Sequence, residues 1–97
     1  MRHFYRTQLP AADVLRAADT FFPAMELDRA GHTAKTRVYS GQLGTLQLSV
    51  KAEGGHYTFV EVATDQMGES RLDRNAKRFF VELHRSDDPG HRIEAAY

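Results

Sequence analysis

Cysteine is absent from this chain of 97 residues. Without it there is no disulfide framework, no thiolate zinc site and no cysteine nucleophile. The five histidines, at positions 3, 32, 56, 84 and 91, show none of the HxH, HxxH or HxxxH spacings of a local metal site. We therefore expect surface histidines, no metal and no cofactor.

A surplus of charge of either sign is also missing, because thirteen Lys and Arg balance thirteen Asp and Glu. Binding that depends mainly on neutralising phosphates needs extra cations, so the composition argues against a nucleic-acid-binding protein. A net charge near zero weakens the repulsion between copies. It is compatible with self-association, and we expect a homodimer or a protein partner.

Long apolar runs are missing as well. No segment approaches the roughly 20 apolar residues that cross a bilayer, and residues 1–8 lack the apolar stretch of a signal peptide. We expect no membrane span and a cytoplasmic location. The hydrophobic share of 41% and the ten Phe and Tyr residues predict a single domain over 1–97, with its core in about 3–85 and a turn and frayed tail over 86–97.

The hydrophobic periodicity predicts two helices. Val14, Leu15 and Ala18 recur at helical spacing after Pro10, and Pro23 is expected to end this helix at Phe22. The second helix is predicted after a Ser70 cap and extends to about residue 85. Its apolar stripe comprises Leu72, Ala76, Phe79, Phe80 and Leu83.

Four strands are expected, over residues 3–9, 34–40, 46–51 and 56–64, with 28–32 as a loop. The fold class is therefore α+β, in the order β-α-β-β-β-α. The simplest way to bury the apolar surfaces is a two-layer sandwich with both helices on one face of a four-stranded antiparallel sheet.

The sequence Gly54-Gly55 predicts a hairpin between the last two strands and leaves two registers open. A two- or four-residue loop places Tyr57, Phe59 and Glu61 on the helix side. A bulged or odd-length loop turns Tyr57 and Phe59 outward instead, and we favour it because it does not bury Glu61 in the core. The predicted open face then forms a binding surface composed of Arg37, Tyr39, Gln47, Lys51, Tyr57 and Phe59.

No residue pattern indicates catalysis. The serines do not lie in a GxSxG elbow, and Glu61 and Asp65 are expected to be solvated acids near a strand end. The basic side of the second helix is predicted to be a solvated face, on which Asp73 and Glu82 can pair with Lys77, Arg78 or Arg85. The cations of this side are Arg71, Arg74, Lys77, Arg78 and Arg85.

The order of elements resembles one half-repeat of the TATA-binding-protein fold, and also a shortened helix-grip domain of the START or Bet v 1 type. The segment from Ser70 to Phe79 is similar to the final helix of a TATA-binding half-repeat. The resemblance implies a concave sheet that binds DNA, a partner or a lipid-like ligand after two copies or repeats combine. It transfers no site residue, because the intercalating aromatic pairs of the DNA-binding version have no match in this sequence.

Three functions are consistent with these features. The first is a non-enzymatic interaction module that self-associates or binds a protein partner through the open sheet face. The second is a binder of a small apolar ligand, held near Phe21, Phe22, Met25 and Phe80. The third is nucleic-acid binding by the sheet face or the second helix.

Overall fold

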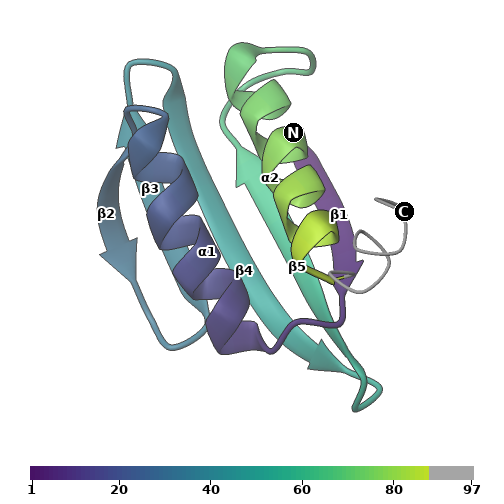
Figure 1. The fold of residues 1–97 in the computed structure, drawn as a ribbon. Coiled ribbons are helices and arrows are strands. Elements are labelled where there is room, and N and C mark those ends of the chain that lie inside the picture. The colour runs from purple at the N-terminus through teal and green to yellow at the C-terminus, as the bar shows by residue number, and fades with distance from the viewer. Residues whose placement is uncertain (88–97) are drawn as a thin grey trace, which may run out of the picture.

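The computed structural model describes residues 1–87 and contains five strands and two helices (Figure 1). In chain order they are β1 (Arg2–Thr7), α1 (Ala11–Ala24), β2 (Asp28–His32), β3 (Thr36–Gly41), β4 (Gly44–Glu53), β5 (Tyr57–Thr64) and α2 (Arg71–Asp87). Residues 86 and 87 belong to α2 and not to a tail. The rest of the predicted frayed tail lies outside the described residues.

The sheet is antiparallel throughout, in the order β1-β5-β4-β3-β2. The fold class agrees with the prediction, but the strand number does not, because the predicted loop over 28–32 is the edge strand β2. Its residues carry no alternation of apolar and polar side chains, and four of the five are exposed. Backbone pairing with β3 holds it in place, with a register shift between Arg29 and Gly31. Sequence periodicity does not detect a strand of this kind.

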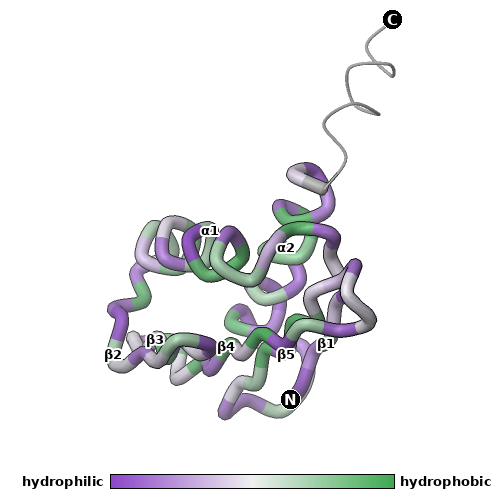
Figure 2. Tube along the Cα trace, turned by 90° about the horizontal axis from the view of Figure 1, so that it is seen from below, coloured by the Kyte–Doolittle hydropathy of each residue, from purple (hydrophilic) through white to green (hydrophobic). Residues whose placement is uncertain are grey.

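Both helices cover the same face of the sheet, as the view in Figure 2 shows. The helices bury their apolar stripes against alternating residues of the central strands, which is the arrangement expected for a two-layer fold. The fully buried core contains Val14, Ala18 and Phe22 from α1, Leu72, Ala76 and Phe79 from α2, and Leu46, Leu48, Val60 and Val62 from the sheet.

Helix α1 extends two residues beyond the predicted end at Phe22 and includes Pro23 in its last turn. Pro23 lacks the N–H that would donate to the carbonyl of Asp19, and the helix ends one residue after it. The chain then turns through Glu26, whose φ of 64° lies in the left-handed region. The N–H of Leu27 closes the end by donating to the carbonyl of Phe22 at 3.2 Å.

The β4–β5 hairpin has the odd-length loop of the favoured alternative. Glu53 pairs with Tyr57 across residues 54–56, and Leu48 pairs with Val62. Gly54 and Gly55 both adopt positive φ, at 66° and 78°, which explains why glycine occupies these positions. The hairpin therefore turns its valines toward the helices.

Neither helix of the described chain is long and apolar enough to cross a membrane.

Candidate functional site: the open sheet face

The sheet face opposite the helices carries four of the six predicted binding residues. Gln47 and Lys51 lie at outward positions of β4, and Tyr57 and Phe59 lie at outward positions of β5. Lys51 is directly opposite Phe59 in the register. Tyr57 is 46% exposed although it is a large aromatic residue.

The structure places the other two predicted residues, Arg37 and Tyr39, on the helix-covered face. Arg37 is opposite Leu48 and Tyr39 is opposite Leu46, and both leucines point into the core. The Tyr39 ring is fully buried and packs on Phe22, with 5.0 Å between the ring centroids. The prediction that these two side chains belong to the open face is therefore wrong.

Asp19 of α1 accepts hydrogen bonds from the inward-facing side chains of Arg37 and Tyr39. The Tyr39 hydroxyl donates to Asp19 Oδ1 at 2.7 Å, and Arg37 Nε donates to both carboxylate oxygens at 3.1 Å. Arg29 adds a third donor at 3.3 Å. Burial by itself raises the pKa of Asp19, but these hydrogen bonds and charges outweigh it and lower that pKa. Burial and the bond to Asp19 raise the pKa of Tyr39. This cluster pins α1 to the sheet.

The open face is aromatic near the β1 edge of the sheet, where it includes Phe4, a residue that the sequence pattern did not assign to it. The Phe4 and Phe59 rings stack with their centroids 5.6 Å apart, and Phe4 is 54% exposed. Tyr57 lies two positions before Phe59 in β5, so both side chains are on the same side of the strand. We call Phe4, Tyr57 and Phe59 the aromatic patch.

Charged side chains of both signs lie beside the aromatic patch and form ion pairs with one another. The guanidinium of Arg6 lies 5.2 Å from the centroid of the Phe59 ring and pairs with the Glu53 carboxylate. Arg2 Nε lies 3.7 Å from a carboxylate oxygen of Glu61. Because each of these arginines has a carboxylate neighbour, the open face presents both charges and little excess of either.

The four residues predicted to contact an apolar ligand do not surround a common cavity. Phe22 is fully buried in the core, and Phe80 stacks on Tyr5 with 5.4 Å between centroids. Phe21 lines a groove of about 420 Å³ between the two helices. Met25 lines a different cleft, where α1 ends.

A buried polar cluster at the start of α2 is the arrangement most similar to a catalytic one. Asp73 Oδ1 lies 2.9 Å from His3 Nε2 and accepts a bond from Thr64 Oγ1 at 2.8 Å. Ser70 Oγ donates to Asp73 Oδ2 at 2.7 Å and accepts from the Asp73 N–H at 3.0 Å.

This cluster is a helix cap extended by a histidine. The aspartate lies between the serine and the histidine, so His3 has no contact through which it could take a proton from Ser70, as a triad requires. Ser70 and Asp73 instead form a capping arrangement that satisfies the first turn of α2. Its position between β1, β5 and α2 indicates a structural role.

Glu61 and Asp65, the acids near the end of β5, each have a partner other than one another. Asp65 accepts from the Thr45 N–H at 3.1 Å and from Gln66, and these bonds lower its pKa, whereas Glu61 pairs with Arg2. Residues 1–87 contain no group of three or more His, Asp or Glu side chains placed to hold a metal ion.

The chain matches no protein-family model, and no curated protein sequence matches it. Its function is therefore inferred from the geometry of the described residues.

Proposed function

We propose that this protein is a non-enzymatic interaction module that binds another protein surface, in the first instance a second copy of itself, through the open sheet face. The observation that carries the proposal is the aromatic patch. Phe4 and Tyr57 are about half exposed on a sheet face that neither helix covers. Clustered aromatic side chains left in water are typical of interfaces, where their burial contributes much of the binding free energy.

The charges around the patch favour a protein partner. Arg2, Arg6 and Lys51 lie on the same face as Glu53 and Glu61. A surface with both signs can pair with another copy of itself, because each cation finds a carboxylate on the other copy. The net charge of zero also limits the repulsion between copies.

The same charges argue against a nucleic-acid platform on this face. Stacking platforms combine exposed aromatics with cations that are free to contact phosphates. Here Arg6 is bound to Glu53 and Arg2 lies beside Glu61. A phosphate would have to displace these carboxylates or lie beside them.

Native mass spectrometry and sedimentation velocity test the proposal directly. The wild-type chain is expected to be dimeric at micromolar concentration. Tyr57→Ser with Phe59→Ser should shift it to monomer, because the change removes two of the three rings of the patch. Val81→Ser is the matched control, since Val81 is 51% exposed but lies on α2.

Folding of each variant is checked by circular dichroism and by its melting temperature. A wild-type monomer that binds no protein partner contradicts the proposal, and so does a dimer whose mass is unchanged in the double variant. Salt-dependent binding of the wild type to a single-stranded oligonucleotide, lost in the double variant, would contradict it in favour of nucleic acid.

A further inference from the structure

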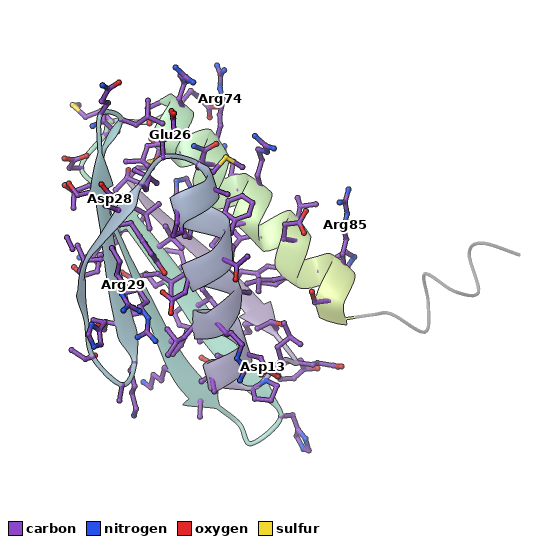
Figure 3. The ribbon with its side chains drawn as sticks, turned by 60° about the vertical axis from the view of Figure 1, so that its left-hand side comes forward. Asp13, Glu26, Asp28, Arg29, Arg74 and Arg85 are labelled. Atoms are coloured by element: carbon purple, nitrogen blue, oxygen red, sulfur yellow. The ribbon has the colours of Figure 1, made fainter. Side chains whose placement is uncertain are left out.

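A second surface, separate from the open sheet face, is a cleft of about 750 Å³ at the end of the molecule where α1 ends and α2 begins. Its walls come from the segment after α1, from the β3–β4 turn and from the first half of α2. Figure 3 shows Arg74 of α2 at the same end as Glu26 and Asp28. The lining residues that bear on its chemistry are Arg71, Arg74, Asn75, Arg78, Glu26 and Asp28.

Arg71, Arg74 and Arg78 lie on one side of α2, because spacings of three, four and seven residues return to the same face of a helix. The stripe extends about 10 Å along the helix axis at 1.5 Å per residue. All three side chains are exposed and all three line the cleft. The cleft therefore has a wall with three guanidinium groups.

None of these three arginines forms an ion pair with another residue of the described chain. Every other arginine in residues 1–87 does so, namely Arg2, Arg6, Arg16, Arg29, Arg37 and Arg85. Of the two acids of α2 that were expected to pair with its cations, Glu82 pairs with Arg85 as predicted, whereas Asp73 is buried against His3. Neither acid forms an ion pair with the three arginines of the cleft.

A bound anion would stabilise this arrangement. Like charges at a spacing of three or four residues repel one another, and Arg71 and Arg74 lie in the first turns of α2, where the helix dipole disfavours cations. Ser70 caps the helix but brings no charge into the cleft. A bound anion would reduce both effects.

The opposite wall carries the complementary charge. Glu26 and Asp28 line the same cleft, and neither forms an ion pair within residues 1–87. A ligand in the cleft therefore meets cations on one side and carboxylates on the other. A continuous polyanion such as nucleic acid would be repelled by the second wall, whereas a small ligand with both charges satisfies the two walls together.

We propose that this cleft binds a small phosphate monoester that also carries an amine. A phosphate group has enough acceptor oxygens and charge to take hydrogen bonds from more than one arginine, whereas a single carboxylate is satisfied by one bidentate arginine. The amine donates to Glu26 and Asp28. The volume of the cleft lies within the range of about 300–1,000 Å³ of small-molecule sites.

Isothermal titration calorimetry with O-phosphoethanolamine at low ionic strength tests this site, with inorganic phosphate and ethanolamine as the two half-ligands. Arg74→Gln and Arg78→Gln should each weaken the binding of O-phosphoethanolamine at least tenfold. Lys77→Gln is the matched control, because Lys77 is an exposed cation of the same helix that pairs with Glu69 and does not line the cleft. It should change the affinity less than twofold.

A second set of variants tests the opposite wall. Glu26→Gln with Asp28→Asn should weaken the binding of O-phosphoethanolamine and leave the binding of inorganic phosphate unchanged or stronger. These residues are exposed, so the variants should fold, which circular dichroism checks.

Three results would overturn the proposal. The first is no binding of O-phosphoethanolamine at millimolar concentration. The second is an equal loss of affinity in the Lys77→Gln control, which would show a general charge effect. The third is tight binding of an oligonucleotide that Arg74→Gln abolishes, which would assign the arginines to nucleic acid. None of these results depends on the oligomeric state, so they are distinct from failure of the sheet-face proposal.

Discussion

His3 Nε2 lies 2.9 Å from the buried carboxylate of Asp73, and the two residues are seventy positions apart in the sequence. Their contact joins the first strand to the start of the last helix. Thr64 and Ser70 complete the set of partners of Asp73, which is 1% exposed. This cluster fixes β1, β5 and α2 relative to one another, and so holds Phe4 on β1 beside Phe59 on β5.

Asp73→Asn is expected to destabilise the fold. The amide keeps the shape but replaces one acceptor oxygen with a donor, which leaves donors of His3, Ser70 or Thr64 without a partner. Loss of buried hydrogen bonds to a charged group should lower the free energy of unfolding by about 2–4 kcal/mol. Urea denaturation measures the change.

Asp13→Asn is the control for Asp73→Asn. Asp13 lies in the first turn of α1, and its ion pair with Arg16 is exposed to solvent. An exposed pair near a helix start contributes no more than about 1 kcal/mol. Equal losses of unfolding free energy in the two variants would show that the buried cluster stabilises the fold no more than an exposed ion pair does.

Acid should destabilise the protein through the same residue. Burial alone would raise the pKa of Asp73, but the hydrogen bonds from His3, Ser70 and Thr64 lower it from 3.8 to about 2. Between these two values the unfolded chain binds more protons than the folded one, so the free energy of unfolding falls as the pH falls. The contribution of Asp73 is fully present above its unfolded pKa and is lost as the pH drops through about 2.

Denaturation curves recorded from pH 6 to pH 2 measure this dependence. The wild-type curve should be steeper below pH 4 than that of Asp73→Asn, which lacks the carboxyl group. Parallel curves would assign the acid sensitivity to other carboxylates.

Two glycines are expected to differ in their tolerance of alanine. Gly54 has a φ of 66° and open space where a Cβ would lie, so Gly54→Ala should cost only the backbone strain, about 1 kcal/mol. Gly44 has a φ of 128°, and a Cβ there would lie 2.4 Å from Oδ1 of Asp65. Gly44→Ala must also displace the Asp65 side chain that accepts from the Thr45 N–H, and should cost about 2 kcal/mol or more. Thermal melts compare the two, and similar losses would contradict the contact at Gly44.

The outward direction of Tyr57 and Phe59 was predictable from the sequence. The alternative register buries Glu61 among apolar side chains, where an unpaired carboxylate is costly. The cost of burying Glu61 therefore indicates the correct face for the side chains of β5, without knowledge of the sheet order.

The side of Tyr39 is also encoded locally, in the spacing of two glycines. Gly41 and Gly44 pair across a two-residue turn, so counting back from the turn places Tyr39 opposite Leu46 on the core side. The acceptor that makes this position favourable, Asp19, lies twenty residues away on α1. Sequence periodicity does not reveal that contact.

Phe4 and β2 could not be assigned from the sequence for different reasons. The face to which Phe4 belongs depends on β1 pairing with β5, and this pairing joins strands more than fifty residues apart. Strand β2 has no apolar side of its own and is held by backbone hydrogen bonds to β3. Both features depend on pairing between strands that local patterns do not encode.

The most direct test of the central claim, that the open sheet face is the association surface, is a concentration series of ¹H–¹⁵N correlation spectra of the wild-type protein. The account predicts that amide shifts change with concentration in β1, β4 and β5, at Phe4, Lys51 and Phe59, while the amide of Val81 on α2 stays constant. Shifts that do not change with concentration, or that change only in α1 and α2, would contradict the account.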